Sequence, residues 1–163
     1  PNLNHAAKSF AYDFNFYDAG GDIAGGFSGD SFIYAGEVKY ILLPNVMPGA
    51  DFANVDFKIS KYEWVSKDAF GGLPSIQTSN IVTETDNKNT VVQGKIFNND
   101  TIVFSRVTLV AILRGSLGQI AGASQTEIEN LLPNETKTFS IIYPAVPNLD
   151  TYGTRVFVYS TRQ

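Results

Sequence analysis

A long-period internal repeat constrains the fold of this chain more than any other feature of its sequence. Three short phrases of the first half return in the second half in the same order, 97, 98 and 100 residues later. They lie at residues 21–25 and 118–122, at residues 35–39 and 133–137, and at residues 44–46 and 144–146. Because short insertions fall in the turns between elements, the small drift in spacing is expected of a duplicated domain.

The period is too long for a solenoid, whose repeats span about 20–50 residues. A chain of 163 residues that is divided by this repeat gives two domains of about 80 residues each. We predict a first domain at residues 1–66, a connection at residues 67–75 and a second domain at residues 76–163. The connection carries the apolar residues Phe70 and Leu73, so we expect a semi-rigid joint.

The composition suits small, densely packed β-domains. The chain holds 12 Phe, 8 Tyr and one Trp, and such side chains are enriched in strands. Only 17% of its residues are charged, below the roughly 25% of typical soluble domains. This balance favours a secreted or cell-surface β-protein over a cytosolic enzyme.

Charge and cysteine content exclude several classes of partner and chemistry. The net charge is −4, and neither half has a basic stripe, so we expect no capture of nucleic acid or of an anionic membrane. The absence of cysteine excludes disulfides, thiolate metal sites and thiol catalysis. No apolar run reaches the roughly 18 residues of a membrane span, so we expect no direct membrane insertion by this segment and any export or anchoring signal to lie outside it.

Alternation of apolar and polar residues with a period of two runs through the first half and is typical of strands. Phe10, Tyr12, Phe14 and Phe16 share one face of the first expected strand. A turn rich in Gly and Asp follows at residues 18–22. Further strands are expected at residues 23–27, 37–43 and 55–64, with a loop at residues 44–48.

The second half carries the same order of expected strands, preceded by two extra ones. The extra strands are expected at residues 77–85 and 91–98, and the others at residues 106–113, 119–123, 135–143 and 155–160. The best helix candidate, residues 125–132, stops at Pro133 and has one or two turns at most. Short strands between turns indicate an all-β fold of two tandem immunoglobulin-like β-sandwich domains, and we expect the first to lack the N-terminal strands of the second.

One phrase of each half lies at the signature position of a known family. Residues 14–18 (FNFYD) resemble the signature of FxLYD domains, with Phe16 where that family usually has Leu. Residues 110–114 (VAILR) stand at the same place in the second half and depart from the signature.

The surrounding elements extend this resemblance. Residues 92–99 (VQGKIFNN) resemble the family's V-x-G-x-[hydrophobic]-x-N strand. Residues 132–136 (LPNET) resemble its L-x-P-G-E-[ST] turn, which residues 34–38 (YAGEV) echo in the first half. The resemblance implies an immunoglobulin- or fibronectin-like sandwich of an exported prokaryotic protein, and the family offers no catalytic residues to carry over.

No group of residues stands out as a catalytic site, and we predict neither catalytic nor metal-binding residues nor a cofactor. His5 is the only histidine, and no Ser and Asp are singled out to complete a triad with it. Asp18, Asp22 and Asp30 flank glycine-rich turns and offer the oxygens that calcium prefers, but the closing bidentate Glu of a calcium loop is absent. We therefore expect turn-forming carboxylates, with a calcium site as the alternative.

Two further features have a structural interpretation. The pairs Glu37–Lys39 and Glu135–Lys137 recur in both halves, which favours a shared role in closing the edge of each sandwich. Tyr62 and Trp64 stand beside the connection, where burial between the domains is expected; if exposed, they would offer a surface for a sugar or a partner protein.

The function that these features favour is a non-catalytic structural or protein-interaction module. A sandwich without its first strands exposes a sheet edge and apolar core, which invites a protein partner or self-association. The alternatives are a subunit of an extracellular fibre or surface lattice assembled by strand complementation, and a carbohydrate-binding module. A fragment of a longer protein, with the missing strands upstream, is also compatible with the pattern.

Overall fold

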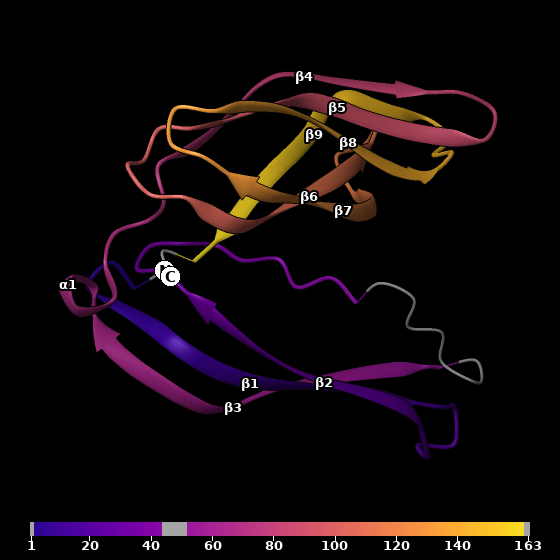
Figure 1. Cartoon of the computed structure of the whole chain (residues 1–163). Helices are drawn as coiled ribbons and strands as arrows, with labels where there is room; N and C mark the ends of the chain where they lie inside the picture. Colours follow the sequence, from indigo (N-terminus) through magenta and orange to yellow (C-terminus); the bar gives the residue numbers. More distant parts are fainter. Residues whose placement is uncertain (1, 44–51, 162–163) are drawn as a thin grey trace. The chain divides into compact units, whose positions relative to one another are not determined.

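The computed structural model describes residues 2–43 and 52–161 (Figure 1). Within these residues the chain forms nine β-strands and one short helix, which confirms the predicted all-β class. The chain divides into two compact units, residues 1–39 with 43–73 and residues 40–42 with 74–163. Each unit is organised around its own antiparallel sheets.

The first unit is built on one three-stranded sheet. Its strands are β1 (His5–Tyr17), β2 (Ile23–Ile33) and β3 (Asn54–Ser66), in the order β2-β1-β3. The predicted turn joins β1 to β2: the Asp18 amide donates to the Asp22 carbonyl at 2.9 Å, and Gly21 has a φ of 88°. Glycine adopts this left-handed conformation without the steric penalty of a side chain.

One face of this sheet is rich in aromatic residues. Phe14 of the central strand lies opposite Phe27 of β2 and Phe57 of β3, so the three rings share a face. The Phe14 and Phe57 ring centroids are 4.7 Å apart. We call this surface the aromatic face; it comprises Tyr12, Phe14, Phe16, Phe27, Val55 and Phe57.

The pairing of β3 with β1 changes register near Lys61, which has a φ of 48°. Such an irregularity increases the local twist and redirects the side chains beyond it. Past this point Trp64 pairs with Ala7, which on its other side pairs with Ile33.

Helix α1 (Lys67–Phe70) is a single turn that follows β3. The Ser66 hydroxyl caps it by accepting from the Ala69 amide at 3.3 Å. The Phe70 ring centroid lies 4.8 Å from that of Tyr34. The start of the predicted connection is therefore helical and packed on the first unit.

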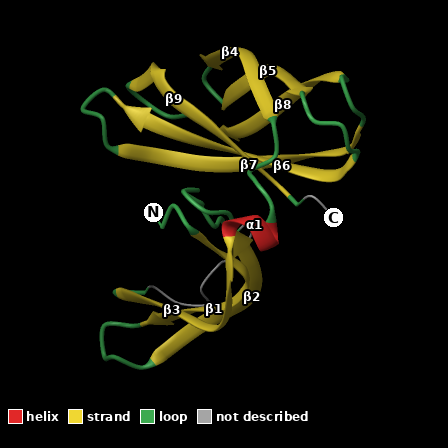
Figure 2. Ribbon diagram, turned by 90° about the vertical axis from the view of Figure 1, so that its left-hand side faces the viewer, coloured by secondary structure: helices red, strands yellow, loops and turns green. Residues whose placement is uncertain are grey.

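The second unit is a β-sandwich of two three-stranded sheets, seen as two layers in Figure 2. One sheet joins β4 (Ile76–Thr85), β5 (Asn89–Asn98) and β8 (Thr136–Pro144) in the order β4-β5-β8. The other joins β6 (Phe104–Gly115), β7 (Ile120–Leu131) and β9 (Leu149–Ser160) in the order β7-β6-β9. The second order repeats that of β2-β1-β3, with the central strand first in the chain.

A single apolar core lies between these two sheets. Among its buried members are Val92 and Ile96 of β5, Phe139 and Ile141 of β8, and Phe104, Val107 and Leu109 of β6. The predicted burial of Leu109, Phe139 and Ile141 is confirmed, as is that of Phe16 in the first unit. The predicted burial of Phe14 is wrong, because its side chain is only half-buried.

Residues 40–42 belong to the second unit and cover the outer side of β6. Val110 and Ile112, which point away from the core, pack with Tyr159, and Tyr40 and Leu42 lie against this cluster. The Tyr40 amide donates to the Tyr159 hydroxyl at 2.9 Å. This arrangement explains why the sheet β7-β6-β9 is apolar on both faces.

The strand predicted at residues 37–43 is wrong, because this segment is irregular. The corresponding segment of the second unit, β8, is a strand that pairs with β5 along its length. In the described part of the first unit all three strands belong to the sheet β2-β1-β3. Alternation of apolar and polar side chains does not by itself make a strand, because the backbone of a strand also needs a neighbouring strand for its hydrogen bonds.

Other expectations about single elements need correction. Residues 125–132, the best candidate for a short helix, are not helical, since β7 extends through Leu131. The strand expected at residues 23–27 extends to Ile33. Paired strands lengthen as far as their neighbour supplies hydrogen bonds, which local sequence does not show. The loop predicted at residues 44–48 lies outside the described residues.

Candidate binding surface

An apolar groove of about 220 Å³ lies at the end of the first unit's sheet, next to the aromatic face. All three strands contribute to it. Its lining consists of Ala7 and Phe10 from β1, Ile33 from β2, and Ile59, Tyr62 and Trp64 from β3. The change of register near Lys61 places the last two of these side chains on the groove.

The groove is open to solvent on the β3 side. Tyr62 and Trp64 are 59% and 54% exposed, and Ile59 is 48% exposed. The expected burial of Tyr62 and Trp64 is therefore wrong: they line a surface hollow. Ala7 lies at the floor with only 2% exposure, and its small side chain leaves the space above it open.

The second unit has a large residue at the place of Ala7. Phe104 pairs with Leu131, the last residue of β7, as Ala7 pairs with Ile33, the last residue of β2. Phe104 and Leu131 are both fully buried in the core of the sandwich. The same position thus holds a buried ring in one sheet, and in the other a small buried alanine that borders an open groove.

The aromatic face continues this exposed apolar surface along β3. Val55 and Phe57 are exposed at 48% and 45%, and Phe27 on β2 is exposed at 38%. Contiguous apolar patches on a protein surface are characteristic of interaction sites. The groove and the aromatic face together form the candidate binding surface.

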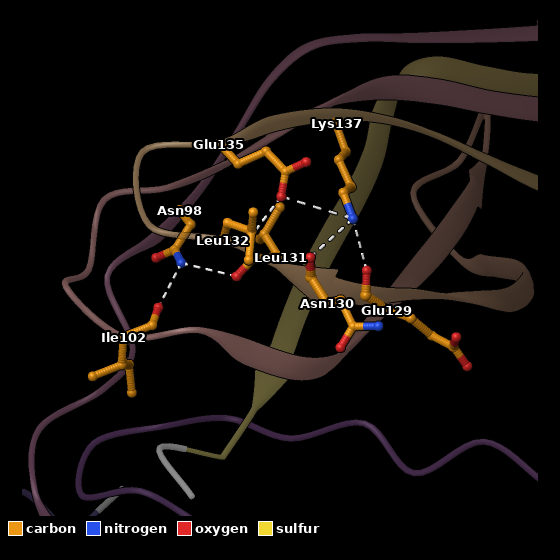
Figure 3. Close-up of polar contacts among 8 residues, drawn as sticks. All are labelled: Asn98, Ile102, Glu129, Asn130, Leu131, Leu132, Glu135 and Lys137. Atoms are coloured by element: carbon orange, nitrogen blue, oxygen red, sulfur yellow. Dashed lines mark hydrogen bonds and ion pairs between the residues drawn. The ribbon is translucent and has the colours of Figure 1, made fainter.

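A turn stabilised by its own glutamate follows β7 in the second unit (Figure 3). The Leu132 amide donates to the Glu135 carboxylate at 2.8 Å, and the Glu135 amide donates to the Leu132 carbonyl at 3.1 Å. Lys137 lies 3.8 Å from that carboxylate and donates to the carbonyls of Glu129 and Asn130 at 2.8 and 3.0 Å. The pair therefore fastens the turn to the end of β7.

The turn that follows β2 makes matching bonds. The Tyr34 amide donates to the Glu37 carboxylate at 2.9 Å, and the Glu37 amide donates to the Tyr34 carbonyl at 3.1 Å. Lys39 donates to the Phe32 carbonyl at 3.0 Å, and its ammonium lies 3.4 Å from the centroid of the Phe32 ring. The recurring Glu–Lys pairs thus hold turns at the ends of β2 and β7.

Burial shifts the titration of the first pair. It lowers the pKa of Lys39 to about 8, and the neighbouring Glu37 carboxylate only partly offsets this loss of hydration. Burial also raises the pKa of Glu37, against the opposing effects of the Tyr34 amide and of Lys39. These shifts follow from a structural turn, and both groups are engaged in it.

An asparagine ties each of these turns to an earlier part of its unit. In the second unit the Asn134 amide donates to the Asn98 carbonyl at 2.9 Å, and the buried Asn98 side chain donates to the carbonyls of Ile102 and Leu131 at 2.8 and 3.1 Å (Figure 3). In the first unit the Gly36 amide donates to the Asn2 carbonyl at 2.8 Å. Asn98 is the last residue of β5, so Asn2 stands where β5 ends in the other unit.

The structure does not bring the remaining candidate residues together. Asp18 accepts from the amides of Gly20 and Asp22 at 2.8 and 3.0 Å, as a turn residue does. Asp30 lies on β2 opposite Ala11, and the exposed His5 begins β1. In residues 2–43 and 52–161, no three His, Cys, Asp or Glu side chains are grouped as metal ligands.

A second hollow lies on the sheet β4-β5-β8, with a volume of about 320 Å³ and a mixed lining that includes Glu84, Gln93 and Lys95. Phe139 in its lining is buried, whereas Glu84, Gln93 and Lys95 are exposed. The apolar groove is therefore the more distinctive surface. The groove was not predicted, although Ala7 contrasts in size with Phe104, which stands 97 residues later in the sequence.

Comparisons with known proteins give limited information. No protein-family model matches the chain, and no curated protein matches it. Within the part of the chain that the structure describes, no helix combines the length and apolar character that crossing a bilayer requires.

Two solved structures are weakly similar to the chain. One is IrmA from Escherichia coli, with a TM-score of 0.36 and 19% identity over 54% of this chain and 76% of that one. The other is a β-glucuronidase from Bacteroides uniformis, with a TM-score of 0.32 and 14% identity over 88% of this chain and 19% of that one. At these scores neither likeness carries an argument about fold or activity.

Proposed function

We propose that this chain is a non-catalytic protein-interaction module of a secreted or cell-surface protein. In this proposal it consists of two copies of one immunoglobulin-like sandwich, and the described sheet of the first copy keeps an apolar face exposed. The exposed groove and aromatic face then serve as the surface that binds a protein partner. The single observation that carries the proposal is the contrast between exposed Trp64 and Phe57 and the fully buried core of the second unit.

Matched hydrogen bonds support the duplication. The Gly21 amide donates to the Asp18 carbonyl at 3.1 Å, and the Gly118 amide donates to the Gly115 carbonyl at 2.8 Å, in turns that join corresponding strands. The hydrogen bonds of Glu37 in the first unit match those of Glu135 in the second, and the bond to the Asn2 carbonyl matches that to the Asn98 carbonyl. Such agreement in turns that are distant in sequence is expected of two copies that descend from one domain.

The resemblance of residues 14–18 to the FxLYD signature supports placement outside the cell, as does the low share of charged residues. The net charge of −4 supports a protein partner over nucleic acid, because nucleic-acid surfaces are basic. A carbohydrate platform is less well supported. Sugar stacking uses flat exposed rings, whereas the Tyr62 and Trp64 rings are inclined by 56°.

Site-specific photo-cross-linking in the cells that make the protein tests this function. A photoreactive phenylalanine analogue would replace Trp64 on the groove or, as a control, Tyr152, which is 93% exposed in the second unit. We expect a defined protein adduct, identified by mass spectrometry, from position 64 alone. Equal adducts from both positions, or none from position 64, would contradict an interaction surface on the first unit.

A further inference from the structure

Strand β3 forms a long exposed edge of the first unit's sheet. Within the described residues it pairs with β1 alone, so the backbone groups on its other side face outward. Eleven of its thirteen residues are exposed, whereas β9, the edge strand at the equivalent place in the second unit, exposes three of its twelve. An edge that bears exposed apolar side chains is a template for pairing with another strand.

An edge partner differs from a covering layer. In the second unit β5 and β8 lie over the sheet β7-β6-β9, yet β9 remains at the edge of that sheet. A layer over a face contacts side chains, whereas a strand at the edge uses backbone amides and carbonyls. A segment over the aromatic face would therefore leave the backbone edge of β3 available.

The irregularity at Lys61 restricts how β3 can pair with a second copy of itself. Side chains alternate along a strand, and the extra residue places Tyr62 and Trp64 on the face of Ile59. Antiparallel partners set side chains of one face opposite each other. In a symmetric pair, an odd-numbered residue before Lys61 must therefore lie opposite an even-numbered residue after it, and the reverse.

One register that meets this condition matches opposite charges. In it Lys58 of each copy lies opposite Glu63 of the other. Glu63 lies 3.6 Å from Lys8 of its own sheet, and a carboxylate has acceptor sites for both ammonium groups. Opposite charges at directly facing positions stabilise an antiparallel pair of strands.

The same register matches apolar side chains on the other face of the sheet. It sets Phe57 opposite Trp64 and Ile59 opposite Tyr62, each pair occurring twice in a symmetric dimer. All four side chains are between 45% and 59% exposed in the single chain. Aromatic and β-branched residues that face each other across two strands form stabilising pairs, because each removes the other from water.

The registers shifted by two residues either way lose this match. One shift brings Asp56 opposite Glu63 and Lys58 opposite Lys61, so like charges face each other. The other sets Lys58 opposite Val65, which removes the charge pair. Of these three registers, the sequence of β3 is complementary to itself in one.

We propose that two copies of this chain pair through β3 in antiparallel orientation, with Lys58 of each copy opposite Glu63 of the other. The pairing joins two three-stranded sheets into one continuous sheet. It is two-fold symmetric, so the same edge serves both copies and the assembly closes at a dimer. This inference rests on the proposed function and names the partner as a second copy of the chain.

Charge reversal tests the register in the full chain. Lys58→Glu and Glu63→Lys each set like charges opposite each other, at positions that are exposed in the single chain. We expect the wild type to dimerise in sedimentation velocity, and each variant alone to dimerise at least about tenfold more weakly. An equimolar mixture of the two variants restores both opposite-charge pairs and should dimerise as the wild type does. Lys95→Glu, at an exposed position of the second unit, is the control and should leave dimerisation unchanged.

Disulfide formation measures the register directly, because the chain has no cysteine of its own. Lys58→Cys and Glu63→Cys proteins, mixed and oxidised, should give a cross-linked dimer on a non-reducing gel, since directly opposed positions come within disulfide range. Neither protein alone should cross-link, because each position faces the other one. The control mixture of Asp56→Cys with Glu63→Cys reports the register in which like charges face each other and should stay monomeric on the gel.

The outcomes separate this inference from the proposed function. A wild type that stays monomeric at its highest soluble concentration, dimers that withstand both charge reversals, or equal cross-linking of the control mixture would overturn the β3 pairing. A different protein captured by the photoreactive group at position 64, with a chain that stays monomeric, would leave the proposed function standing and remove only the dimer. No adduct at position 64 and a monomeric chain would contradict both.

Discussion

The sheets β2-β1-β3 and β7-β6-β9 share a strand order but differ in what lies over them. In the second, β5 and β8 cover one face, and Val92 and Phe139 join a common core with β6. In the first, Val55 and Phe57 on the equivalent side remain about half exposed. The pattern of apolar residues along a strand therefore does not decide whether a sheet face becomes core or exposed surface; the presence of a covering layer does.

The largest loss of stability should come from truncating the buried Phe104 of the second unit. Phe104→Ala removes a fully buried ring and should lower the free energy of unfolding of the second unit by about 3–5 kcal/mol. The contrasting variant, Phe57→Ala, removes a ring that is 45% exposed and should cost about 1 kcal/mol.

Urea unfolding measures both losses, with circular dichroism for the whole chain and Trp64 fluorescence for the first unit. A loss as large for Phe57→Ala as for Phe104→Ala would break the comparison. It would mean that the aromatic face is covered in solution.

Removal of the asparagine side chain should likewise destabilise the second unit, at Asn98, more than the first unit, at Asn2. Asn98→Ala removes the side-chain donor to the buried bond with the Leu131 carbonyl and to the partly buried bond with the Ile102 carbonyl, so it should lower the free energy of unfolding by about 2–3 kcal/mol. Asn2→Ala, at an exposed position, should cost about 0.5–1 kcal/mol. Chemical denaturation of both variants checks this, and equal costs would indicate that Asn2 is covered by a strand as Asn98 is.

The pH dependence of stability should reveal the buried Lys39. Its folded pKa of about 8 lies below its ordinary value of 10.5, so between these values the folded state has released a proton that the unfolded state still binds. Stability therefore rises from pH 8 towards pH 10, by about 2 kcal/mol once solvent screening is allowed for.

Lys39→Met is the control for this titration, since it keeps the aliphatic stem and removes the proton. The comparison of the two proteins also cancels the opposite trend near pH 10, where burial raises the pKa of Tyr12 and the unfolded state ionises first. Parallel stability curves for wild type and Lys39→Met would refute the buried ammonium.

The smallest loss of stability should come from replacing the turn glycines, and it should be about equal in the two units. Gly21 and Gly118 have φ values of 88° and 81°, and a side chain at either would meet no atom within 4 Å. Gly21→Ala and Gly118→Ala should therefore each cost about 1 kcal/mol through backbone strain alone. Thermal unfolding of the two variants measures this, and clearly unequal losses would argue against equivalent turns.

Features that depend on near neighbours in the chain could be predicted from the sequence. The alternation of Phe10, Tyr12 and Phe16 predicted the first strand and its apolar side, and the Gly- and Asp-rich residues 18–22 predicted the turn after β1. The recurrence of the Glu–Lys pairs predicted a shared structural role, which the turns after β2 and β7 provide. These patterns are local, so they can be read without knowing what the segment packs against.

Which apolar residues are covered depends on contacts between strands that are distant in the sequence. Residues 37–43 alternate as a strand does, yet they form none, and within the second unit the Tyr40 amide donates to the Tyr159 hydroxyl instead. The groove likewise arises where Ala7, Ile33 and Trp64 meet from three strands, after a change of register that the sequence does not announce. Strand pairing and burial depend on partners far away in the chain, and the free energy of an apolar side chain depends on whether such a partner removes it from water.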